Sequence, residues 1–133
     1  MEKDGLHTHR KLRPVLPLDL EDWLTKDDFD RLGNLPWIGF CHDSFLALFV
    51  GNAEQTCWEG HWWSRENATR SLTDCRKAIK MFGKKTGAKE LFGLTPCEDK
   101  KALKMAKLLG FVPQRFMVDR LGKMCLLTRK EIK

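Results

Sequence analysis

A strand–helix–strand succession between residues 57 and 94 constrains the fold more than any other feature of this sequence. The segment Cys57–Trp63 contains three tryptophans, a residue type that favours strands. Apolar residues then recur at spacings of three and four, which predicts a helix with one buried stripe made of Leu72, Cys75, Ile79 and Phe82. Glu90–Leu94 follows as a second strand. Because parallel neighbours need a crossover of this length, we predict that the two strands pair in parallel.

Alternation along the tryptophan-rich strand divides its side chains between the two faces of the sheet. One face carries Trp58, Gly60 and Trp62, and the other carries Glu59, His61 and Trp63. We expect Trp62 to lie in the core, because a large aromatic side chain contributes most of its stabilisation when it is buried. Trp63 is either a second core residue or part of a patch that binds a partner.

The other segments predict a mixed sheet with helices packed on it, which is an α/β fold of the α+β mixed-sheet kind. Residues 19–32 alternate acids with large apolar side chains and predict one or two short amphipathic helices. Strands are expected at Trp37–Cys41 and Phe45–Val50, as an antiparallel pair, and at Phe111–Val118 and Lys123–Thr128, as a closing hairpin.

Glycines and one capping motif predict where the two longer helices begin and end. Gly83 and Gly87 are expected to end the first helix. Thr95-Pro96-Cys97-Glu98 matches a capping box with proline at the first helical position, which predicts that the second helix starts there. The apolar pattern of this helix runs to Leu109, and Gly110 follows as its C-terminal glycine.

The 133 residues are expected to form one domain, in which residues 1–34 make an N-terminal segment with the acidic amphipathic helix. The five cysteines lie 16 or more residues apart and form no CxxC pair, so we expect reduced core residues in a cytoplasmic protein. No metal site is expected, because His7 and His9 are too few ligands for one. No apolar run reaches the roughly 18 residues of a membrane-spanning helix.

The charge is distributed unevenly along the chain. Residues 1–75 hold 8 Lys and Arg against 13 Asp and Glu, a net charge of −5, whereas residues 76–133 hold 16 against 5, a net charge of +11. A basic half of this kind either presents ordinary solvated helix faces or attracts phosphates and acidic partners. Direct nucleic-acid binding would use the basic residues Arg70, Arg76, Lys77, Lys80, Lys84 and Lys85.

One spaced motif carries a family resemblance. The run Asp99-x-x-Ala102-x-x-x-Ala106-x-x-x-Gly110-Phe111 is similar to the N-x-x-A-x-x-x-Y-x-x-x-G-F run of the GNAT N-acetyltransferase superfamily. Together with the order of the elements and the strand-to-helix junction at Trp62–Leu72, it makes residues 35–130 resemble that superfamily. The resemblance implies the GNAT fold, with a central mixed sheet flanked by helices.

The resemblance also implies where acetyl-CoA and the catalytic groups would lie. Arg65-x-x-Ala68-x-Arg70 is similar to the family's [Q/R]-x-x-G-x-[G/A] pyrophosphate motif, so Arg65 and the residues Ala68, Thr69 and Arg70 at the helix N-terminus would bind the coenzyme. Arg70 is a long side chain at a small-residue position, where it would either contact phosphate or fill the groove. Asp99 stands where the family has Asn and would lie at the coenzyme site, and Ala106 stands where the family often has the tyrosine that protonates the leaving thiolate. Glu59 and His61 are the candidates for the general base, or else a solvated acid and a packed histidine.

A looser resemblance joins the tryptophan-rich strand to small GNAT-like proteins of short-tailed bacteriophages. Glu59, His61, Trp62 and Trp63 match an E-x-H-W-W-like strand of those head-assembly or internal virion proteins. With the coenzyme and acid positions altered, the main expectation is a non-catalytic phage morphogenesis protein without a cofactor, which binds other phage structural or ejection proteins. The alternative is an acetyl-CoA-dependent N-acetyltransferase, and a third possibility is nucleic-acid binding through the basic C-terminal half.

Overall fold

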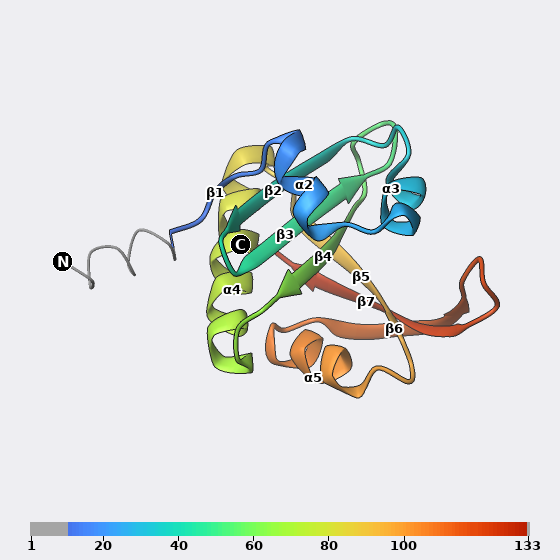
Figure 1. The fold of residues 1–133 in the computed structure, drawn as a ribbon. Coiled ribbons are helices and arrows are strands. Elements are labelled where there is room, and N and C mark those ends of the chain that lie inside the picture. The colour runs from blue at the N-terminus through green and yellow to red at the C-terminus, as the bar shows by residue number, and fades with distance from the viewer. Residues whose placement is uncertain (1–10, 133) are drawn as a thin grey trace.

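The computed structural model describes residues 11–132, which form a seven-stranded mixed sheet with helices on both faces (Figure 1). The strand order is β1-β2-β3-β4-β5-β7-β6. Along the chain the elements are β1 (Arg13–Pro14), α2 (Pro17–Trp23), α3 (Lys26–Leu32), β2 (Trp37–His42), β3 (Phe45–Gly51), β4 (Trp58–Ser64), α4 (Ala68–Thr86), β5 (Glu90–Pro96), α5 (Lys100–Leu108), β6 (Val112–Val118) and β7 (Met124–Glu131). The predicted fold class is confirmed.

Two hydrophobic cores lie on opposite faces of the sheet. The α4-side core contains Phe45, Phe49, Phe82, Leu91 and Ala106, and joins α4 and α5 to the strands. The α3-side core contains Leu20, Leu24, Leu32, Leu46 and Leu48, and joins α2 and α3 to β3. Successive residues of β3 therefore alternate between the two cores, as the side-chain period of a strand requires. Trp62 packs against the α4-side core as predicted, and Trp63 packs against the α3-side core.

Aromatic packing fixes α4 to the sheet. Phe82 is fully buried, stacks on Phe49 with 4.4 Å between ring centroids, and meets the edge of Trp58 at 5.3 Å. The predicted apolar stripe of α4 is confirmed, since Cys75, Ile79 and Phe82 are buried while the lysines of this helix are exposed. Leu72, the fourth member, is half-buried and packs against the same core.

The predicted parallel pairing of β4 with β5 is confirmed. Only one residue pair, Glu59 with Phe92, is in register between these strands, whereas β3 and β4 pair along their whole length. Beyond that pair β4 and β5 diverge, and α4 connects them across the opposite face from α3 (Figure 1). The sheet is therefore continuous at Glu59 and Phe92, and β4 and β5 separate on the C-terminal side of this pair.

Gly83 does not end α4, contrary to the sequence-based expectation. The helix continues to Thr86, and Gly87 ends it with a φ of 71° and an amide that donates to the Gly83 carbonyl at 2.8 Å. A Cβ atom on Gly83 would lie 2.7 Å from a methyl group of Ile132. Glycine is therefore needed at position 83 for close packing against the C-terminal strand, and not for a change of backbone direction.

The capping box predicted at Thr95-Pro96-Cys97-Glu98 is wrong. Thr95 and Pro96 belong to β5, where they lie opposite Leu126 and Cys125 of β7. The N-cap of α5 is Asp99, whose Oδ1 accepts a hydrogen bond from the Ala102 amide at 3.1 Å. Residues 95 and 96 continue β5 despite their helix-start pattern, because pairing with β7 provides hydrogen-bond partners for the backbone N–H and C=O groups of this segment.

The cysteines are free thiols, but they are not all core residues. Cys41, Cys75 and Cys125 are buried, Cys97 is half-buried and Cys57 is exposed in the loop before β4. Burial raises the pKa of the Cys75 thiol to about 12. His7 and His9 lie outside the described residues. Within residues 11–132, no helix has the length and apolar character needed to cross a membrane.

Replacing Phe82 with alanine should remove the contact that holds α4 on the sheet. We expect a loss of about 3–5 kcal/mol in the free energy of unfolding, because the substitution leaves a cavity between Phe49 and Trp58. Chemical denaturation measures this loss. The exposed Lys80→Ala in the same helix should change stability by less than about 0.5 kcal/mol, and equal effects of the two substitutions would contradict the packing described here.

Asp19 should make stability depend on pH in the acid range. A hydrogen bond from Arg13 and one from the Leu16 amide lower the pKa of Asp19 from 3.8 to about 2. A depressed folded-state pKa stabilises the protein above the unfolded value, and this contribution disappears as the pH falls through the folded value. The stability difference between wild type and Asp19→Asn, measured by denaturation, should therefore shrink between about pH 4 and pH 2. A difference that stays constant over this range would contradict the assignment.

Candidate functional site

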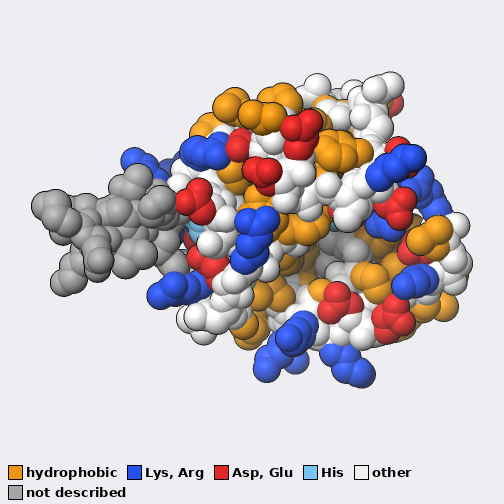
Figure 2. Space-filling view, in the orientation of Figure 1, with side chains coloured by type: hydrophobic (Ala, Val, Ile, Leu, Met, Phe, Trp, Pro, Cys, Tyr) orange, Lys and Arg blue, Asp and Glu red, His pale blue; other side chains and the backbone are white. Residues whose placement is uncertain are grey.

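A large pocket opens on the face of the sheet that α2 and α3 only partly cover. Figure 2 shows it as a hollow with hydrophobic side chains on its floor and charged side chains on its rim. It has a volume of about 980 Å³ and lies between α3 and the β6–β7 hairpin. Its apolar lining includes Leu48, Val50, Trp63, Phe92, Leu94 and Leu127. This size is within the range of small-molecule binding sites.

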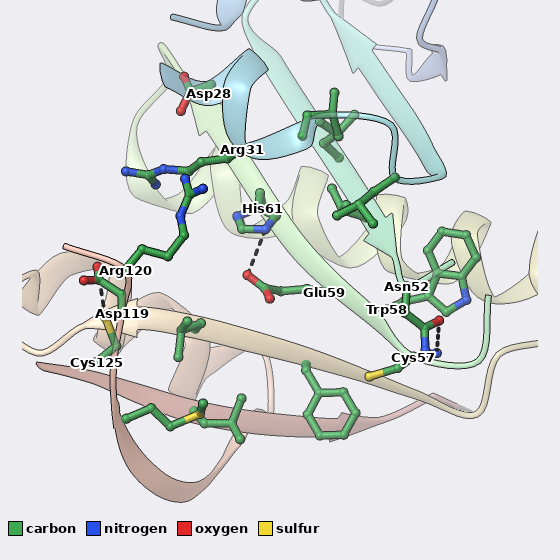
Figure 3. Close-up of a pocket in the computed structure, with 18 of the residues that line it drawn as sticks. Asp28, Arg31, Asn52, Cys57, Trp58, Glu59, His61, Asp119, Arg120 and Cys125 are labelled. Carbon is green, nitrogen blue, oxygen red and sulfur yellow. Dashed lines mark hydrogen bonds and ion pairs between the residues drawn. The ribbon is translucent and has the colours of Figure 1, made fainter. Parts of the chain in front are cut away.

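Glu59 and His61 lie together in the wall of this pocket. Glu59 Oε1 is 2.9 Å from His61 Nε2, and the side chains are 38% and 40% exposed (Figure 3). They project from the same face of β4 because they are two residues apart in a strand. The structure thus brings the two predicted catalytic candidates into one carboxylate–imidazole pair that faces a cavity. Such a pair can accept a proton from a bound amine.

The pairing of β4 determines where this pair lies. Glu59 is the residue in register with Phe92, so the pair sits where the parallel ladder ends and the two strands begin to diverge. Gly60, between them, points to the other face, where a Cβ atom would lie 3.3 Å from Leu91. The small residue lets β4 approach β5 closely at this point.

The N-terminus of α4 follows directly from the end of β4. Asn67 is its N-cap, and the side-chain oxygen accepts a hydrogen bond from the Arg70 amide at 2.9 Å. The amides of Ala68 and Thr69 belong to the first turn, which has no helical acceptors for its N–H groups. They remain directed along the helix axis, where the helix dipole favours an anion. The sequence analysis overlooked Asn67, although asparagine before a helical pattern is a known N-cap signal.

Arg65 is engaged away from the α4 N-terminus. The guanidinium carbon lies 3.9 Å from the centre of the Trp23 ring, and its nitrogens donate to the carbonyls of Asp22 and Asp43 at 3.3 Å. The side chain therefore ties the β4–α4 loop to α2. Arg70, in contrast, is exposed in the first turn of α4.

Two other motif positions have structural roles. The Asp99 carboxylate caps α5 through its contact with the Ala102 amide. Ala106 is 5% exposed and belongs to the α4-side core, so its side chain faces the interior and not the pocket. The whole sequence contains no tyrosine. Any proton for a leaving group must therefore come from another donor or from water.

A buried polar cluster, which sequence reasoning missed, anchors α4 to the β2–β3 turn. His42 Nε2 lies 2.8 Å from Asp74 Oδ2 and 3.6 Å from Glu66 Oε1, an arrangement that could hold a metal ion. The Ser44 amide donates to His42 Nδ1 at 3.0 Å, so the ring proton is on Nε2 and is donated to Asp74. A metal bound at Nε2 would move that proton to Nδ1, opposite the Ser44 N–H. The geometry therefore suits a hydrogen-bonded anchor better than a metal centre.

Sequence comparison does not identify a relative. No protein-family profile matches the chain, and no curated protein sequence matches it. Sequence similarity therefore assigns no function to this chain, and only similarity of three-dimensional structure is informative.

Several solved structures with a similar fold are acetyltransferases. Mutant forms of the spermidine/spermine N-acetyltransferase from Vibrio cholerae superpose with a TM-score of 0.72 at 14% identity, over 91% of this chain and 93% of that one. The microcin C7 self-immunity acetyltransferase, in complex with acetyl-CoA and AMP, gives 0.61 at 12% identity, over 78% of this chain and 64% of that one. The ribosomal-protein-S5-alanine acetyltransferase from Vibrio fischeri gives 0.61 at 12% identity, over 86% and 66%.

These matches overturn the main functional expectation from the sequence. A non-catalytic phage morphogenesis protein was expected, but the matched structures are acetyltransferases and favour the catalytic alternative. The expectation of no cofactor gains no support either, since one of the matched proteins was solved with acetyl-CoA. At these identities the likeness concerns the fold, and the fold of this chain is that of the GNAT acetyltransferases.

Proposed function

We propose that this protein is an acetyl-CoA-dependent N-acetyltransferase that acetylates a small amine in the pocket beside β4. The observation that carries the proposal is the Glu59–His61 pair, which lies 2.9 Å apart in the wall of a cavity of about 980 Å³. The acetyltransferase fold of the matched structures supports the same activity.

The residues at the end of β4 fit the phosphate-bearing part of acetyl-CoA. The Ala68 and Thr69 amides would hold the pyrophosphate, because Asn67 caps only the Arg70 amide and the helix dipole attracts anions. Arg70 would add a cation beside them. When bound, acetyl-CoA supplies an acetyl group activated as a thioester. Beyond Glu59 the backbones of β4 and β5 are not paired with each other, so their polar groups could contact the acetyl end of the coenzyme.

Glu59 acts as the general base on the acceptor amine. Its carboxylate accepts a proton from the ammonium form of the acceptor, which leaves the amine neutral and nucleophilic. His61 holds the Glu59 side chain through the contact between Nε2 and Oε1, so that the other carboxylate oxygen can face the acceptor. Because both side chains are more than a third exposed, Glu59 can pass the proton on to water. The apolar floor around Phe92 and Leu94 limits the water near the reacting amine.

Replacing Glu59 with glutamine should remove the base and keep the shape of the side chain. We expect kcat for acetyl transfer to fall by about 10²–10⁴-fold, the usual contribution of a general base. Acetyl-CoA affinity should stay unchanged, because Glu59 is not at the α4 N-terminus. The rate is measured as thiol release in the presence of a panel of amines, and affinity by calorimetry.

His61→Asn tests the positioning role separately. Asparagine can still donate a hydrogen bond to Glu59, so kcat should fall less than in Glu59→Gln, and the shape of the pH–rate profile should be retained. Wild-type turnover that persists in Glu59→Gln would exclude Glu59 as the base. Absence of acetyl-CoA binding to the wild-type protein would contradict the proposed function itself.

Arg70→Gln tests the predicted phosphate contact. If Arg70 contributes a charge-assisted contact, the Kd for acetyl-CoA should rise about tenfold in the variant. The exposed Lys77→Gln, further along α4, should leave this Kd unchanged. Unchanged or tighter binding in Arg70→Gln would mean that the long side chain obstructs the coenzyme groove instead of contacting phosphate.

A further inference from the structure

Three acids and three arginines line the pocket, and within residues 11–132 no ion pair joins an acid of this set to one of the arginines. The acids that line the pocket already have partners: Asp28 accepts the Thr25 amide at 2.9 Å, and Asp119 Oδ1 accepts the Leu121 and Lys123 amides at 2.8 and 2.9 Å. Glu59 is paired with His61. These acids maintain a helix cap, a hairpin turn and the catalytic pair.

Three arginines line the same pocket from separate elements, namely Arg31 of α3, Arg115 of β6 and Arg120 of the β6–β7 turn. Among residues 11–132, the guanidinium group of none of the three makes a hydrogen bond or an ion pair. Figure 3 shows the side chains of Arg31 and Arg120 pointing toward one another beside Asp119. Both side chains line the pocket beside the β6–β7 turn.

The position of Arg31 is supported by its electrostatic effect on the hairpin. The hydrogen bond from the Lys123 amide lowers the pKa of Asp119, and the charge of Arg31 lowers it further. The side chain of Arg31 is therefore near enough to the β6–β7 turn to act on the charge of Asp119. Asp119 keeps its negative charge, but its Oδ1 is directed to two backbone amides, and within residues 11–132 neither Arg31 nor Arg120 donates to it, so the forked donors of both arginines are available to another group.

We propose that the acceptor is an amine that also carries an anionic group, a carboxylate or a phosphate, which Arg31 and Arg120 bind while Glu59 and His61 receive the amine. This proposal rests on the acetyltransferase function proposed above and specifies its substrate class. The apolar floor between the two ends fits a nonpolar connecting segment in the acceptor. Planar guanidinium groups bind carboxylates and phosphates with paired hydrogen bonds, whereas a purely cationic polyamine would meet repulsion at this end.

A series of amines with the same apolar chain tests the anionic end directly. The probes are hexylamine, 6-aminohexanoate and 6-aminohexyl phosphate, with spermidine as the cationic comparison. Calorimetry on the protein without acetyl-CoA should show the carboxylate or the phosphate probe binding about tenfold or more tightly than hexylamine. With acetyl-CoA present, kcat/KM should follow the same order. The better of the two anionic probes identifies the group that the arginines bind.

Variants then assign the preference to the arginines. Arg31→Gln and Arg120→Gln should each weaken the anionic probe about tenfold or more and leave hexylamine unchanged. Lys77→Gln, on the opposite face of the sheet, should have no effect on any probe. Equal binding of hexylamine and both anionic probes, preference for spermidine, or insensitivity to both arginine substitutions would overturn the proposal.

The two proposals fail in different ways. If hexylamine or spermidine is acetylated at the same rate in wild type, Arg31→Gln and Arg120→Gln, and the anionic probes are not preferred, the acetyltransferase is supported and the anionic acceptor is refuted. Arginine-dependent binding of an anionic probe without any acetyl transfer, in a protein that does not bind acetyl-CoA, would refute the enzyme and leave only an anion-binding pocket.

Discussion

The parallel contact between β4 and β5 is the constraint on which the rest of the structure depends. Two parallel neighbours require a crossover, and α4 provides it because Phe82 stacks on Phe49 and fixes the helix to the sheet. The strands stay in register only at Glu59 and Phe92. Beyond that point β4 leads into the N-terminus of α4, while β5 stays paired with β7 of the hairpin and leads into α5. The position of the α4 N-terminus and that of the Glu59–His61 pair both depend on this one divergence.

The alternation of β4 allows a single strand to serve both the core and the site. Trp58 and Trp62 stabilise the α4-side core, and Glu59 and His61 face the pocket. A shift of one residue in the pairing with β3 would exchange these two sets and turn the Glu59 and His61 side chains into the α4-side core. The seven-residue register between β3 and β4 prevents that shift. Burial of the tryptophans on one face of β4 thus fixes the other face, with Glu59 and His61, toward the pocket.

The residues that depart from the family motif are weak evidence against catalysis. Arg65 stacks on Trp23, Asp99 caps α5 and Ala106 fills the core, so each residue has a clear structural role. Their departure from the family pattern encouraged the non-catalytic interpretation, which the matched acetyltransferase structures contradict. The pocket is a better guide to function than the motif, because it combines a polar pair, an apolar floor and arginines without ion-pair partners among residues 11–132 in one place.

Periodicity determined the elements that repeat over short distances: the two faces of β4, the buried stripe of α4, the closing hairpin and the parallel order of β4 and β5. The candidate pair Glu59–His61 could also be predicted, because residues two apart in a strand share a face. Only the tertiary structure decided the features that depend on distant partners. Pairing with β7 made Thr95 part of a strand, His42 came within hydrogen-bond distance of Asp74, 32 residues away, and Arg31 came to line the same pocket as Arg120. The physical reason is that local patterns encode side-chain direction, whereas long-range contacts select between the local alternatives that those patterns leave open.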